Sequence, residues 1–109
     1  MNESLSDPGE QPGAVACNLS VIPASERAAH AALARKVLFA DETRVRDIEE
    51  GLMFEVRPDR LIDVVTFLEN ERRCCRHLGF TLEIPPREAD LILRVTGPGA
   101  SDELRALVR

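Results

Sequence analysis

The chain has 109 residues, of which 44% are hydrophobic and 30% charged, a composition typical of one globular domain. Its formal net charge of -5 and its lack of Trp and Tyr argue against nucleic-acid binding. No apolar run approaches the ~20 residues that span a bilayer, and the N-terminus lacks the basic start and apolar core of a signal peptide. We therefore expect a cytoplasmic location and no membrane partner.

The N-terminal segment, residues 1–13, is polar and rich in Pro and Gly, which predicts a disordered tail. Residues 14–109 are predicted to form a single α+β domain. Apolar and other residues alternate strictly from Val15 to Val21, and this period of two predicts a strand with Cys17 on its buried face.

A helix of about fifteen residues is predicted next, opening after Pro23 with Ser25 as its N-cap and running through Ala40. The expected packing stripe of this helix is Ala29, Leu33, Val37 and Ala40. His30 lies near the edge of that stripe and has no neighbour at a metal-ligand spacing, so it is interpreted as a half-exposed surface histidine.

The remaining chain predicts two hairpins and two further helices. The strands "TRVRDI" and "LMFEVR" flank the turn "EEG", and "FTLEI" and "DLILRV" flank "PPREA". Between the hairpins a helix is expected from about Arg60 to His77, capped by Asp59 and stopped by Gly79, and Ser101 is expected to cap a short terminal helix. This order predicts a two-layer α+β fold, in which two main helices cover one face of a mostly antiparallel sheet of about five strands.

The second helix carries the candidate site. Glu71 projects near the centre of its apolar face, with Cys74 and Cys75 three and four residues later. A buried, unpaired carboxylate costs several kcal/mol, so Glu71 must be protonated, hydrogen-bonded, paired with an arginine or bound to a cation. Arg72 and Arg94 are the candidate arginine partners.

The three cysteines suggest a thiol site. In a reducing compartment they are expected to be free thiols rather than a disulfide framework. Adjacent helical cysteines point about 100° apart and cannot form an ordinary disulfide with each other. Together, Cys17, Cys74, Cys75 and Glu71 would make a four-ligand site for zinc or a softer thiophilic ion.

Two other hypotheses remain open at this point. In a redox protein or enzyme, Cys74 or Cys75 would be the nucleophile near Glu71, with Cys17 as the disulfide partner. In a non-enzymatic interaction module the cysteines would only fill the core, and the protein would act through a protein partner or self-association.

Three segments resemble a group of small, mostly uncharacterised bacterial proteins: "ACNLS", "ERRCCRHLGFTLEI" and "LRVTGPGA". Members of this group share an ACxL start, an ERxCCxFxxF core and a terminal TGP segment, and they usually carry Pro-Phe where this chain has Arg76 and His77. The resemblance implies that Cys17, Glu71 and the cysteine pair belong together, but it implies no reaction.

Overall fold

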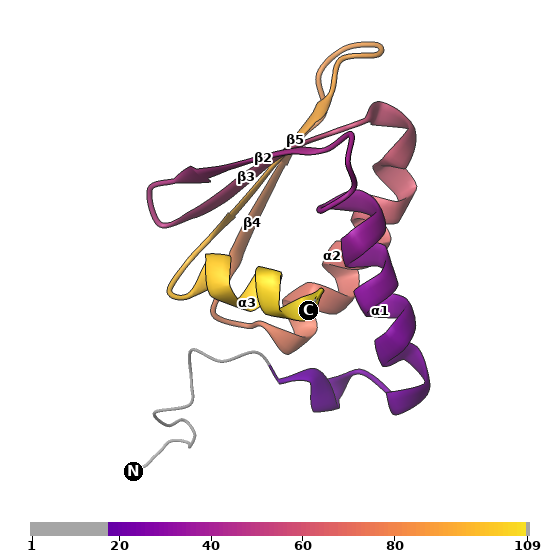
Figure 1. Ribbon diagram of the computed structural model, residues 1–109, viewed down its shortest axis with the longest axis vertical. Helices are drawn as coiled ribbons and strands as arrows, with labels where there is room; N and C mark the ends of the chain where they lie inside the picture. The colour runs from indigo at the N-terminus through magenta and orange to yellow at the C-terminus, as the bar shows by residue number, and fades with distance from the viewer. Residues whose placement is uncertain (1–17, 109) are drawn as a thin grey trace.

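A computed structural model describes residues 18–108, which form one four-stranded sheet and three α-helices (Figure 1). The strands are β2 (Arg44–Ile48), β3 (Gly51–Val56), β4 (Gly79–Glu83) and β5 (Leu91–Thr96). The helices are α1 (Ala24–Val37), α2 (Leu61–Cys74) and α3 (Ala100–Leu107), and the 3-10 helices are η2 (Leu19–Val21) and η3 (Pro58–Arg60). The predicted α+β class is confirmed, but with four strands and three helices rather than about five and two.

Both predicted hairpins are present in an entirely antiparallel sheet with the strand order β2-β3-β5-β4. The central strands β3 and β5 pair in a register that places Phe54 opposite Leu93. Alternate residues of the two strands are buried on one face: Leu52, Phe54, Val56, Leu91, Leu93 and Val95. The helices pack against this apolar face and enclose the core between the two layers (Figure 1).

The predicted strand from Val15 to Val21 is wrong in the part that the structure describes, because Leu19–Val21 forms the 3-10 helix η2. The side-chain Oδ1 of Asn18 accepts hydrogen bonds from the backbone N–H of Ser20, at 3.1 Å, and from its hydroxyl. An Asn side chain that bonds the backbone two residues on stabilises a turn instead of an extended strand. Residues 1–13 and Cys17 lie outside the described residues.

Helix α1 begins directly after Pro23, so Ser25 lies inside the first turn and is not the N-cap. The helix ends at Val37, three residues earlier than expected. Its buried residues are His30, Ala34 and Val37. Of the predicted packing stripe, Val37 is buried as expected, whereas Ala29 is exposed and Leu33 and Ala40 are half-buried. His30 takes a place in the core instead.

The other two predicted helix caps are also wrong. Asp59 pairs with Arg57 at 3.1 Å, and Arg60 is the residue that precedes α2. Helix α3 is preceded by Gly99 in the left-handed conformation, with φ of 74°, so Ser101 lies within the helix. A glycine takes this conformation at little cost, which explains the helix start without a side-chain cap.

Helix α2 ends at Cys74, earlier than the predicted end at His77. Cys75 leaves the helical conformation, with φ of -117° and ψ of 69°, although its N–H still donates to the Glu71 carbonyl at 2.8 Å. Gly79 is the first residue of β4 and not the helix stop. The cysteine pair therefore lies at the point where the chain turns from α2 toward the sheet. No helix within residues 18–108 has the length and apolar character needed to cross a membrane.

Candidate functional site

Glu71 is fully buried, with 1% of its surface exposed, as its position on the helical wheel predicted. It belongs to the buried face of α2 that also holds Val64, Phe67 and Cys74. This face packs into the core, so the carboxylate has lost its hydration and depends on neighbouring side chains for hydrogen bonds.

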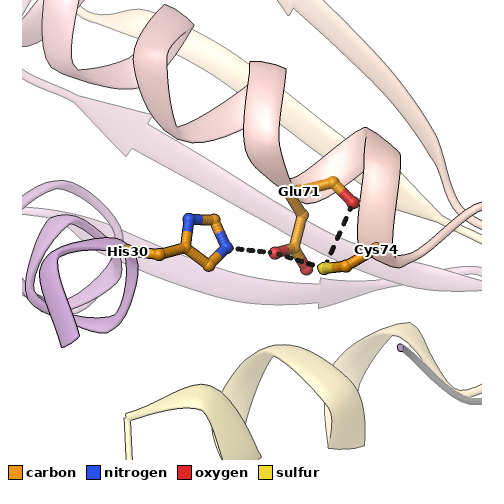
Figure 2. A group of neighbouring side chains, drawn as sticks. All are labelled: His30, Glu71 and Cys74. Carbon is orange, nitrogen blue, oxygen red and sulfur yellow. Dashed lines mark hydrogen bonds and ion pairs between the residues drawn. The ribbon is translucent and has the colours of Figure 1, made fainter. Parts of the chain in front are cut away.

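The main partner of Glu71 is His30, which α1 presents from the opposite side of the cluster (Figure 2). The ring Nε2 of His30 lies 2.8 Å from Oε1 of Glu71, and both side chains are 1% exposed. The imidazole also stacks on Phe67, with ring centroids 4.8 Å apart and an interplanar angle of 8°. The prediction of a half-exposed His30 is thus wrong. Glu71 therefore pairs with His30 and not with either predicted arginine. Arg94 pairs with Glu83 at 3.5 Å, and Arg72 is exposed.

The two cysteines at the end of α2 both contact the Glu71 carboxylate. Cys74 Sγ lies 3.8 Å from Oε1 of Glu71 and 3.6 Å from the backbone carbonyl oxygen of Glu71. Cys75 Sγ lies 3.1 Å from Oε2. The two sulfurs are 3.5 Å apart, so they are neighbours but not bonded to each other, as the helix geometry predicted.

The two cysteines differ in oxidation state. Cys74 is a free, buried thiol, whereas Cys75 takes part in a disulfide, so the expectation of free thiols is wrong for Cys75. A disulfide sulfur carries no proton, and its 3.1 Å approach to Glu71 is therefore a sulfur–oxygen contact rather than a hydrogen bond. Reduction would give Cys75 a thiol able to donate to that oxygen. Cys17 lies outside the described residues.

The protonation of Cys74 is set by its surroundings. Burial, the largest cause, and the charge of Glu71 raise the pKa of the Cys74 thiol from 9.0 to about 12. The group is therefore a neutral thiol at pH 7 and a poor nucleophile in this state. A thiophilic cation would reverse this, because metal binding displaces the proton from a coordinating thiol.

Neither protonation state of His30 satisfies this buried cluster with the side chains that the structure describes. If His30 is protonated, its ring Nδ1 holds a buried N–H, and Nδ1 has no hydrogen-bond partner within residues 18–108. If His30 is neutral, its Nε2–H donates to Glu71 and the charge of the carboxylate has no cation beside it among these partners. Each arrangement is costly in a buried site.

Three ligand atoms converge here in a way that suits a metal ion. One atom each from His30, Glu71 and Cys74 lie within 4.8 Å of one another, and all three residues are buried (Figure 2). Zinc bonds of about 2.0–2.3 Å in a tetrahedral site place ligand atoms roughly 3.3–3.8 Å apart. Shifts on the order of 1 Å would bring the observed atoms to these separations. The histidine is the member of this group that the sequence analysis did not include.

The predicted ligands Glu71, Cys74 and Cys75 thus lie together, with His30 added to them. The resemblance to small bacterial proteins stays a prediction. No protein-family model, no curated protein and no solved structure matches this chain.

Proposed function

We propose that the protein binds one borderline or soft metal ion, with zinc as the reference case, through His30, Glu71 and Cys74. In the reduced protein the Cys75 thiolate completes a four-ligand set. Imidazole, carboxylate and thiolate are all ligands that zinc accepts, and the thiolates also favour softer ions such as Cu(I).

The observation that carries this proposal is the buried Glu71 carboxylate, which contacts the His30 imidazole and the sulfurs of Cys74 and Cys75. A divalent ion bound by neutral His30, ionised Glu71 and the Cys74 thiolate would leave the three-ligand site with no net charge. The charge of the Glu71 carboxylate would then be neutralised without a protonated His30. A site built only for packing would gain nothing from placing these groups together, because apolar side chains of similar volume are often as stabilising as a buried ionic pair.

The test is a titration of the reduced, chelator-treated protein with zinc and with Cu(I), followed by native mass spectrometry. We expect one ion per chain. Replacement of the ligand in Cys74→Ser should weaken binding by at least about 100-fold, because even the removal of a hydrogen-bond partner of a metal ligand costs 10–100-fold. Since coordination displaces the thiol proton, affinity should also rise about tenfold per pH unit for each proton displaced between pH 6 and 8.

A matched control is Cys17→Ser, titrated under the same reducing conditions. The ligand set proposed from the cluster leaves binding in this variant unchanged. If Cys17→Ser loses the ion as Cys74→Ser does, then Cys17 is a ligand, as the sequence analysis predicted. If the reduced parent protein takes up no ion at micromolar concentration, the metal function is wrong and the buried cluster is structural.

A further inference from the structure

We propose that the exposed edge of β4 is a self-association surface, at which two copies of the chain pair antiparallel and join their four-stranded sheets into one continuous sheet. The pairing is centred on Thr81 of both copies. The inference goes beyond the proposed metal binding and does not depend on it.

The sheet has two edge strands within residues 18–108, and these strands differ in charge. The order β2-β3-β5-β4 leaves one side of β2 and one side of β4 without a neighbouring strand. An edge strand presents unpaired N–H and C=O groups, and charged side chains commonly protect such an edge from pairing with another chain. β2 has three charged residues among its five, whereas β4 has one, Glu83 at its end. β4 is therefore the edge that is suited to accept another strand.

The length of β4 determines the register of the proposed pairing. β4 has five residues, Gly79–Glu83, and Thr81 is the middle one. Antiparallel pairing about a twofold axis at Thr81 uses all five residues of both strands, and any other register leaves some of them unpaired. Phe80 and Leu82, which are half-buried against the core, would then lie opposite Leu82 and Phe80 of the second copy. Each copy thereby extends the apolar layer of the other.

A hollow beside β4 provides room for a side chain of the second copy. Its volume is about 530 Å³, and it is lined by Leu68, Arg72, Arg76, Leu78 and Phe80. Ile84, the residue directly after β4, is 59% exposed. In the register centred on Thr81, Ile84 of one copy lies next to Leu78 of the other, at this hollow. Burial of Ile84 there removes an exposed apolar side chain from water, which stabilises the contact.

The two ends of the β4 edge carry opposite charge. At its start, Arg72 and Arg76 border the hollow, and neither forms an ion pair within residues 18–108. At its end, the loop of residues 84–90 projects beyond the sheet and holds Glu88 and Asp90 against one arginine, Arg87 (Figure 1). Antiparallel pairing sets the basic end of each copy beside the acidic end of the other. The edge is thus complementary to a second copy of itself, as a twofold interface requires.

Sedimentation velocity of the metal-free, full-length chain over a range of concentrations tests self-association. We expect a monomer–dimer equilibrium with a dissociation constant in the micromolar range, as for a small interface. Ile84→Lys places a positive charge beside Arg72 and Arg76 of the second copy and should weaken the dimer at least about tenfold, because like charges at an interface repel. The exposed Ile84 lies outside the strand, so the variant should fold as the parent does.

The matched control is Ile62→Lys. Ile62 is an equally large apolar residue with 76% exposure, and it lies about 120° around α2 from Leu68, away from the hollow. This variant should form the dimer with the affinity of the parent protein.

An exchange of charges between the two ends of the edge tests the antiparallel arrangement. One variant carries Arg72→Glu and Arg76→Glu, and the other carries Glu88→Arg and Asp90→Arg. Each variant alone brings like charges together at both ends of the contact and should be mostly monomeric. An equimolar mixture should form the heterodimer with an affinity close to that of the parent dimer, because opposite charges meet again at both ends. Native mass spectrometry distinguishes the heterodimer by its mass.

Three outcomes would overturn the inference. The first is a parent chain that stays monomeric up to hundreds of micromolar, and the second is a dimer that Ile84→Lys and Ile62→Lys affect equally. The third is a mixture of the two charge variants that forms no heterodimer. None of these outcomes bears on zinc binding, so the proposed function stands or fails separately.

Discussion

Replacing Glu71 with methionine should lower the free energy of unfolding by about 3 kcal/mol, because the substitution leaves the His30 ring buried without its partner. The reverse variant, His30→Leu, should lower the free energy of unfolding by a similar amount, since it leaves the Glu71 carboxylate buried without its His30 partner. A domain of this size has a total stability of roughly 5–15 kcal/mol, so either change removes a large share of it. Urea unfolding of the metal-free oxidised proteins measures both losses.

The double variant His30→Leu/Glu71→Met completes the cycle. It removes both polar groups at nearly constant volume, and apolar replacement of a buried pair is often neutral or stabilising. We expect its stability to lie within about 1 kcal/mol of the parent, which gives a coupling energy of several kcal/mol. Strictly additive single effects would show that the 2.8 Å contact between the two side chains carries no coupling.

This double variant also serves the functional question, because it is expected to be folded and yet unable to bind an ion. It has lost two of the proposed ligands while keeping Cys74 and Cys75. Zinc binding that survives in it with unchanged affinity would mean that the cysteines bind the ion without His30 and Glu71. The ligand set proposed here would then be wrong.

The strands of the sheet could be predicted because the alternation of apolar residues that indicates a strand lies within a few consecutive residues. β3 and β5 alternate between buried and half-buried residues, with buried Leu52, Phe54 and Val56 on one and Leu91, Leu93 and Val95 on the other. Apolar residues at every second position indicate a strand with one buried face, and this pattern can be recognised without knowing the rest of the fold. The burial of Glu71 was predictable for the same reason, since α2 stays helical through Cys74 and the wheel therefore applies to it.

The position of His30 was not predictable from the same pattern. Helix α1 is rich in alanine, and small side chains on every side leave the direction of its buried face poorly determined. Its spacing to Ala34 and Val37, four and seven residues on, does fit one helical face. The partner that completes the cluster lies 41 residues later in the chain. Only the packing of α1 beside α2 brings the two side chains together (Figure 2).

The protonation of Cys74 predicts a loss of stability in alkali. The thiol has a pKa of about 12 in the folded protein and near 9.0 when unfolded, so the folded state holds the proton more tightly. This contribution is fully present below pH 9.0 and is lost as the pH rises toward 12. Within that window the free energy of unfolding should fall by about 1.4 kcal/mol per pH unit.

The chain suits this measurement, because it has no Tyr and Lys36 is its single lysine, so few other side chains titrate in the same window. Urea unfolding of the oxidised protein at pH 9.5, 10 and 10.5 gives the slope. The matched control, Cys74→Ala, keeps Lys36 and the Cys75 disulfide but lacks the thiol, so its curve should be flatter by the full contribution of Cys74. Parallel curves for the two proteins would contradict the raised pKa.

The same proton links stability to the proposed metal site. With zinc bound, the folded state already holds Cys74 as a thiolate, whereas the unfolded thiol stays protonated below pH 9.0. The unfolded state then binds one more proton than the folded state, and the sign of the pH dependence reverses. At saturating zinc between pH 7 and 8.5, stability should therefore rise by about 1.4 kcal/mol per pH unit for this thiol, with no such rise in Cys74→Ala. A parent protein whose stability shows no zinc-dependent slope in this range does not bind the ion through Cys74.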